Sequence, residues 1–254
     1  VTIGDFDVEF IAVTHSILEP MALAIRTPLG TVVHTGDWKL DPEPVIGPVT
    51  DAARFAEIGD EGVLALVCDS TNAMRDGRSP SETEVGQSLA EIVKEATGRV
   101  AFTTFASNVG RIKSIALAAQ AADRQVVVVG RALRRAIDVA TELGYMEGLQ
   151  PFLDEESYGY LPRSKVVVIL TGSQGEPRAA LARIAEDEHK FVGLSPGDTV
   201  VFSARPIPGN EKAIGNIINQ LCDQGIIVLT DRDRLVHVSG HPRRDELAEM
   251  YRWT

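Results

Sequence analysis

Residues 99–129, RVAFTTFASNVGRIKSIALAAQAADRQVVVV, indicate the fold class of this chain. The stretch begins with a short apolar run over 99–103, typical of a buried strand, and ends with a second such run over 125–129. Between them the sequence predicts a helix over 109–122. Continuous apolar strands that alternate with helices predict a mostly parallel sheet, covered by helices on both faces.

The same alternation continues on both sides of this stretch. Before it, Ser81-Glu82-Thr83-Glu84 combines a serine with acidic residues, which is typical of the first turn of a helix that we expect to run to about Ala96. The pattern therefore predicts an α/β fold for most of the chain. Further helices are expected over 133–143 and 211–222, and further strands over 165–170, 199–203 and 226–229.

The first 80 residues follow a different pattern, in which short strands are separated by turns. Pro28-Leu29-Gly30 is expected at a hairpin tip. The polar stretch 75–80, RDGRSP, contains proline and glycine and is interpreted as a domain boundary. Short strands are expected over 10–13, 21–25 and 31–33, and a buried strand over 63–68.

The composition is that of a globular protein long enough for two domains. The chain has 254 residues, of which 44% are hydrophobic and 24% charged. No apolar run approaches the roughly 20 residues that span a bilayer, and the first residues have no basic head or signal-like core. Cys68 and Cys222 are far apart in apolar surroundings, so we expect buried free thiols in a reducing compartment, and a cytoplasmic location.

The net charge of −11 argues against a protein that coats nucleic acid by bulk electrostatics, because such proteins are basic. It leaves open an enzyme that holds a few phosphates locally, and a metal site can supply positive charge.

Polar clusters follow six of the expected strands. The carboxyl ends of strands are where α/β sheets gather functional groups. A single cluster has an alternative explanation as a helix cap or a turn, whereas six, together with the loop His237-Val238-Ser239-Gly240-His241, are hard to explain by capping alone. The clusters begin at Thr14, His34, Asp69, Thr103, Thr171 and Ser203.

Taken alone, the individual residues leave both structural and functional roles open. His15 and Asp37 are equally compatible with polar turns at strand ends, and Asp69 with a helix cap or an Asx turn. For His34 and His189 we expect only structural roles, at a strand edge and at the surface.

The ordered set of motifs resembles the ribonuclease J family, bacterial RNases of the β-CASP branch of the metallo-β-lactamase superfamily. The resemblance runs from about residue 9 to the end of the chain. It rests on THS at 14–16, TGDWKLD at 35–41, DSTN at 69–72, TFASN at 104–108, GSQGEP at 172–177, IPGNE at 207–211 and HVSGH at 237–241.

The resemblance implies part of a metallo-β-lactamase αββα sandwich with an inserted β-CASP domain. The implied division is residues 1–80 for the end of the first lactamase half, 81–218 for the β-CASP domain, and 219–254 for a return to the lactamase domain. The family's metal-binding His-x-His-x-Asp-His signature is expected upstream of Val1, and its His-Gly-Glu segment after Thr254. We therefore expect an internal fragment that binds zinc poorly and has little nuclease activity by itself.

The resemblance also implies roles for individual residues. His15 matches a metal-ligating histidine, Asp37 the aspartate that bridges two metal ions, and Asp69 the acidic β-CASP residue. His241 matches the β-CASP histidine near the scissile phosphate. The phosphate of a nucleotide is expected at Ser239 and Gly240, and the RNA-facing loops are expected to present Ser107, Asn108, Ser173 and Glu176. Gly110 stands where the family often carries a histidine, so it offers no side chain for an RNA contact there.

The chemistry that the resemblance implies is hydrolysis of RNA phosphodiesters, both endonucleolytic and 5′-to-3′ exonucleolytic. Two zinc ions, with manganese or magnesium as alternatives, are expected about 3.5–4 Å apart, bound by imidazole and carboxylate ligands. His241, oriented by Asp69, is the expected general acid. The expected partner is RNA, with no membrane association and with a homodimer or homotetramer for the parent protein.

Two alternatives to this function remain open. One is another β-CASP nuclease acting on DNA, or a small-molecule hydrolase of the lactamase fold, although a small-molecule hydrolase has no need of the β-CASP insert. The other is a catalytically incompetent RNA-binding fragment.

Overall fold

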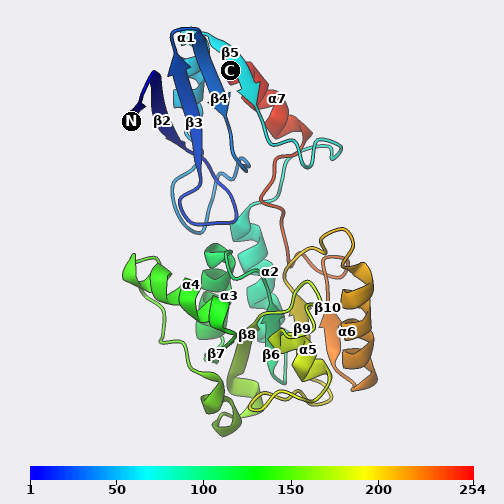
Figure 1. Cartoon of the computed structure of the whole chain (residues 1–254). Helices are drawn as coiled ribbons and strands as arrows, with labels where there is room; N and C mark the ends of the chain where they lie inside the picture. Colours follow the sequence, from blue (N-terminus) through cyan, green and yellow to red (C-terminus); the bar gives the residue numbers. More distant parts are fainter. The chain divides into compact units, whose positions relative to one another are not determined.

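The computed structural model describes residues 1–254, which divide into two compact units (Figure 1). Unit 1 comprises Val1–Glu82 and Ser239–Thr254, and unit 2 comprises Thr83–Val238. No helix is both long enough and apolar enough to cross a bilayer.

Unit 1 is built on a five-stranded sheet with the strand order β1-β2-β3-β4-β5. The first four strands pair antiparallel, with short turns between β1 and β2 and between β3 and β4 and a longer loop, residues 13–20, between β2 and β3. Strand β5 lies parallel to β4 because helix α1 (Ala52–Glu61) lies in the connection between them. The strands are β1 (Thr2–Ile3), β2 (Phe6–Ala12), β3 (Met21–Thr27), β4 (Gly30–His34) and β5 (Val63–Val67).

The core of unit 1 lies between the sheet and two helices, α1 and α7 (Arg244–Trp253). The two helices approach so closely that a Cβ on Gly59 would lie 1.8 Å from the carbonyl oxygen of Trp253, which only a glycine tolerates. The core side chains are Ile11, Val13, Ala22, Ala24, Val33, Trp38, Phe55, Ile58, Leu247 and Met250.

Unit 2 contains a second five-stranded sheet with the order β10-β9-β6-β8-β7, and every pairing in it is parallel. The expected α/β fold with a parallel sheet is therefore confirmed. Strands β7 and β8 lie on one side of the central strand β6, and β9 and β10 lie on the other side, so the strand order reverses at β6. Loops at the carboxyl ends of strands beside such a reversal are the usual place for ligands. The strands are β6 (Val100–Thr103), β7 (Gln125–Val129), β8 (Val166–Leu170), β9 (Thr199–Phe202) and β10 (Ile227–Leu229).

Helices connect these strands, as the alternating pattern predicts. Strand β8 is fully buried, and its Val166, Val168 and Leu170 pack with helices α5 and α6 in one cluster. The helices are α2 (Glu82–Glu95), α3 (Val109–Ala121), α4 (Arg131–Glu142), α5 (Ala180–Ala185) and α6 (Glu211–Asp223), with short 3₁₀ turns η1 (Glu155–Tyr160) and η2 (Arg163–Lys165).

Three details differ from the sequence-based expectations. The strand expected to be buried over 63–68 is exposed in part, with Leu64 67% and Val67 50% accessible, because β5 is an edge strand. Strand β10 is also an edge strand, and Ile227 is 51% exposed. Cys222 is exposed rather than buried, because Ile214, Ile217 and Leu221 form the buried stripe of α6; Cys68 is partly buried.

The compact units do not coincide with the expected domain division at its C-terminal boundary. Residues 219–238 belong to unit 2, since β10 pairs with β9. The assignment of lactamase and β-CASP domains to particular residues stays a prediction.

Candidate metal and acid-base site

Two parallel strands of unit 1 bring the acidic loops together. Strands β4 and β5 end side by side, at His34 and Val67. The Thr35 N–H donates to the Val67 carbonyl oxygen at 3.0 Å, and the Asp69 N–H donates to Thr35 Oγ1 at 3.1 Å. The loops that carry Asp37 and Asp69 are therefore joined at their first residues.

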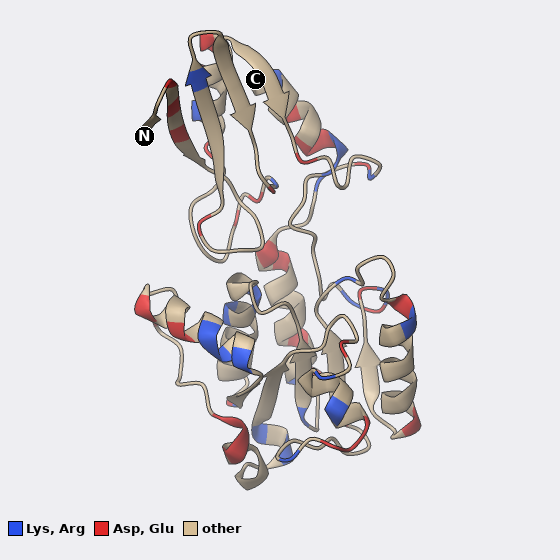
Figure 2. Ribbon diagram, in the orientation of Figure 1, with Lys and Arg blue, Asp and Glu red and all other residues tan.

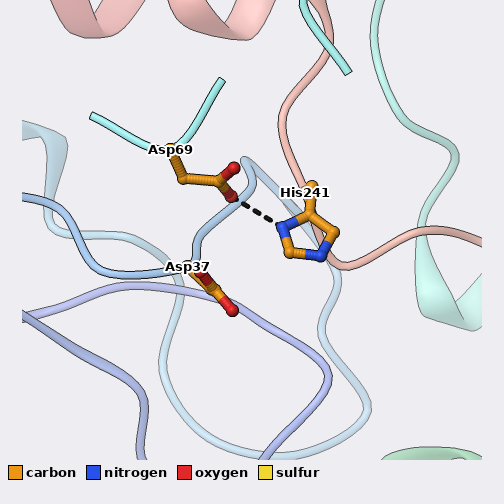
Figure 3. A group of neighbouring side chains, drawn as sticks. All are labelled: Asp37, Asp69 and His241. Carbon is orange, nitrogen blue, oxygen red and sulfur yellow. Dashed lines mark hydrogen bonds and ion pairs between the residues drawn. The ribbon is translucent and has the colours of Figure 1, made fainter. Parts of the chain in front are cut away.

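A histidine from the other end of the chain completes a cluster of three. Asp37, Asp69 and His241 offer ligand atoms that all lie within 4.8 Å of one another, and Figure 3 shows the three side chains converging. The chain returns to unit 1 at Ser239, and His241 lies in the short segment between that point and the start of helix α7. Residues separated by more than 170 positions in the sequence thus form one group.

Asp69 and His241 form a hydrogen-bonded pair, with 2.7 Å between Asp69 Oδ2 and His241 Nδ1 (Figure 3). The other oxygen, Asp69 Oδ1, accepts from the Thr71 backbone N–H at 2.9 Å and from the Thr71 hydroxyl at 2.6 Å. Burial raises the pKa of Asp69, but these hydrogen bonds outweigh it and the pKa is lowered. An ionised Asp69 holds the proton of His241 on Nδ1, which leaves Nε2 directed away from the pair.

His15 lies beside this pair with its own fixed orientation. Its Nδ1 donates to the Gly240 carbonyl oxygen at 2.7 Å, and its Nε2 lies 3.8 Å from Asp37 Oδ2. Burial lowers the pKa of His15, which favours the neutral imidazole that binds metals. A backbone carbonyl on one ring nitrogen is the usual support of a histidine that ligates through the other.

These donors fit part of a divalent metal site. An imidazole nitrogen from His15 and the carboxylate of Asp37, whose side chain is 62% exposed, are ligand types that zinc accepts. Imidazole suits zinc better than magnesium, which prefers oxygen ligands.

The glycine and serine of the same segment are closely packed. The Ser239 hydroxyl oxygen accepts from Asn72 Nδ2 at 2.9 Å. At Gly240 there is no room for a side chain, because a Cβ would lie 2.6 Å from both the His15 ring and Ser16 Oγ. The structure thus brings both residues next to His15 and His241, and their role in binding a phosphate stays a prediction.

The four residues predicted on RNA-facing loops all belong to unit 2. Asn108 is buried and caps α3, since its Oδ1 accepts from the Arg111 N–H at 3.0 Å. Ser173 is buried in the loop after β8, and the exposed Glu176 accepts from the Gln174 N–H at 3.1 Å. Ser107 lies one residue before the cap of α3.

Two residues near the site were not singled out from the sequence. Asn72 is 8% exposed and bonds to Ser239 and to the His241 carbonyl oxygen, and Glu246 is fully buried. The position of Asn72 in the DSTN motif was a signal for the first. For Glu246 the only signal was its place three residues after Arg243, in the first turn of a short helix.

Comparison of the sequence with known proteins shows the family to which the chain belongs. The chain matches the family described as Ribonuclease J, beta-CASP domain, over residues 97–221. It is 64% identical to Ribonuclease J of Sinorhizobium meliloti over 253 residues, which is 100% of this chain and 45% of that protein. It is 43% identical over 242 residues to Ribonuclease J of Thermus thermophilus, covering 95% of this chain and 42% of the relative.

The fold is also similar to a solved structure of low sequence identity. The crystal structure of a protein of unknown function from Enterococcus faecalis V583 superposes with a TM-score of 0.69 at 18% identity, covering 100% of this chain and 57% of that one. At that identity the likeness concerns the fold alone. Against the first two relatives named above, the chain spans less than half of their length.

Proposed function

This chain belongs to the ribonuclease J family, and on that premise we propose that it forms part of a metal-dependent ribonuclease that hydrolyses RNA phosphodiesters. The observation that carries the proposal is the convergence of Asp37, Asp69 and His241, with His15 beside them. Hydrolysis of a phosphodiester requires an activated water and stabilisation of the charge on the reacting phosphate, and this group of side chains suits both tasks.

His15 and Asp37 are the residues that we assign to metal binding, with zinc as the preferred ion and manganese or magnesium as alternatives. A bound metal lowers the pKa of a bound water and neutralises charge on substrate oxygens. The carboxylate of Asp37 is exposed and has two oxygens, so it is suited to bridge two ions. The remaining ligands are assigned to parts of a longer parent protein, because the relatives are more than twice the length of this chain.

Asp69 and His241 are assigned to acid-base catalysis. With its Nδ1 proton held by Asp69, a protonated His241 has a second proton, on Nε2, to donate to the leaving 3′ oxygen of the RNA. Ser239 and Gly240 are assigned to the phosphate group of the substrate, since they adjoin both histidines.

A cationic surface in unit 2 supports RNA binding by this acidic chain. Arg134 and Arg135 follow Arg131 on α4 by three and four positions, so the three residues share one side of the helix. Figure 2 shows basic residues, in blue, along α4. Arg131 and Arg135 are exposed and form no ion pair, whereas Arg134 donates to the Val128 carbonyl oxygen at 2.9 Å. We assign this surface, with the loops that carry Ser107, Asn108, Ser173 and Glu176, to the RNA strand.

Several finer properties belong to the same proposal. The parent protein acts as an endonuclease and as a 5′-to-3′ exonuclease, functions in the cytoplasm, and forms a dimer or tetramer. Residues 1–80 and 219–254 belong to the lactamase domain, and residues 81–218 to the β-CASP domain. The 254-residue chain by itself binds zinc poorly and is inactive, because His15 and Asp37 alone do not complete a two-metal site.

The test compares cleavage of a 5′-monophosphorylated RNA and of the matching DNA by the parent protein and by this chain alone. We expect the parent protein to cleave RNA and to leave the DNA intact, and the isolated chain to cleave neither. Preferential cleavage of DNA would contradict the proposal and would indicate a DNA nuclease of the same fold. RNA binding without cleavage by the parent protein would favour a non-catalytic RNA-binding role.

A further inference from the structure

We propose that Glu246 is a positioning residue of the site. Its buried carboxylate fixes the relative positions of the loops that carry Asp37, Asp69 and His241. The inference rests on the proposed function, because it concerns the same site. Glu246 forms no hydrogen bond with any of the three side chains, and it acts through the backbone that presents them.

The carboxylate of Glu246 is fully buried and accepts four hydrogen bonds. Its Oε1 accepts from the Leu40 N–H at 2.8 Å. Its Oε2 accepts from the Ser79 N–H at 2.9 Å, the Ser79 hydroxyl at 2.9 Å and the Arg243 N–H at 2.8 Å. Every donor is neutral, and none belongs to a basic side chain. The positive end of α7, in whose first turn Glu246 lies, adds to the stabilisation of its charge.

Each of these donors lies on a segment that carries a site residue. Leu40 follows Asp37 by three positions, and Arg243 follows His241 by two. Ser79 lies in the same connection, between β5 and α2, as Asp69. One carboxylate therefore joins three segments that are remote in sequence. A displacement of any one of these segments moves the site residue that the segment carries.

Asn72 connects two of the same segments closer to the site. Its Nδ2 donates to the His241 carbonyl oxygen at 3.1 Å and to Ser239 Oγ at 2.9 Å, and its backbone forms a bridge with Arg243. Asp69 thus orients the His241 ring, Asn72 holds the His241 backbone, and Glu246 holds the next turn.

The charge of Glu246 is required because all its partners are donors. In Glu246→Gln one carboxylate oxygen becomes an NH₂ group, which must face either the Leu40 N–H or the three donors from Ser79 and Arg243. In the parent protein we expect a loss of about 10- to 100-fold in kcat with KM for RNA changed less than about threefold, as for a misplaced catalytic group.

Asp198→Asn is the matched control, because it also neutralises a fully buried carboxylate that accepts backbone hydrogen bonds. Asp198 lies in unit 2 and accepts from the Arg99 N–H at 2.8 Å and the Ser195 N–H at 2.9 Å. We expect this variant to lower Tm at least as much as Glu246→Gln, with kcat unchanged.

A second readout separates this inference from the proposed function. The His241 Nδ1–H that bonds Asp69 gives an imidazole proton signal in the parent protein labelled with ¹⁵N-histidine. We expect Glu246→Gln to shift or broaden the signal and Asp198→Asn to leave it in place, whether or not the protein cleaves RNA. If Glu246→Gln does not fold, Asn72→Ala carries the test, with the same signal change and at least a roughly tenfold lower kcat expected. Equal losses of kcat in the test and control variants, or an unchanged signal and kcat in Glu246→Gln, would overturn the inference.

Discussion

Gly240 is the position where a single methyl group should disturb the site most directly. An alanine Cβ there would lie 2.6 Å from Cε1 and Nδ1 of His15 and from Ser16 Oγ. The backbone of Gly240 does not have a positive φ, so Gly240→Ala acts through contact alone. The His15 ring, whose side chain is only 12% exposed, has to move.

The size of the movement follows from the distances. Restoring an ordinary contact of 3.4 Å from 2.6 Å requires a shift of about 0.8 Å. That shift lengthens the 2.7 Å bond from His15 Nδ1 to the Gly240 carbonyl oxygen beyond hydrogen-bonding distance, which costs about 1 kcal/mol of stability. A catalytic group misplaced by about 1 Å lowers the rate about 10²-fold.

The assay is RNA cleavage by the parent protein, with bound zinc measured on the same samples. We expect kcat/KM to fall about 10²-fold and bound zinc to decrease, while the protein stays folded. Gly215→Ala is the control, because its Cβ would have open space inside α6, and alanine there should raise stability by about 0.5–1 kcal/mol without changing kcat/KM. Full activity and full zinc occupancy in Gly240→Ala would refute the assignment of His15.

Two further variants test electrostatic parts of the structure. Two arginines hold the pKa of Glu9 at about 2, below its usual 4.5, so its contribution to stability is complete above about pH 4.5 and is lost as the pH falls toward 2. Glu9→Gln should therefore lower the unfolding free energy by about 1 kcal/mol at pH 7, with the difference fading between those two values in denaturant titrations; a difference that persists at pH 2 would contradict this. Replacing Arg131 and Arg135 together by alanine should reduce the steepness with which the logarithm of the binding constant for single-stranded RNA falls with the logarithm of the salt concentration, by about 1.4. Lys165→Ala is the control. It removes a charge that is already paired with an aspartate, so it should leave this slope unchanged.

The elements of unit 2 were predictable because their signals are local. Buried strands such as β7 and β8 appear as unbroken apolar runs, and α3, which lies between β6 and β7, begins directly after a capping residue, Asn108. The meeting of Asp37 with Asp69 follows from parallel strands whose carboxyl ends share one edge.

Other features depend on contacts that the sequence does not display. Helices α1 and α7 are only 10 residues long, which is too short for a periodic pattern to identify them. They pack against each other although they are far apart in the sequence. The roles of Asn72 and Glu246 exist only once three remote loops meet. Cys222 resembles a core residue in sequence, but helical geometry places it on the exposed side of α6.

We assign Asp37 to a metal site that hydrolyses RNA, and the variant Asp37→Ala of the parent protein is the decisive test of this assignment. The carboxylate is exposed and lies next to His15, so its removal should leave the fold and the RNA affinity largely intact. We predict that RNA turnover is abolished while the Kd for RNA stays within about threefold of the wild type. Undiminished turnover in a folded Asp37→Ala protein would contradict a role of Asp37 in metal binding.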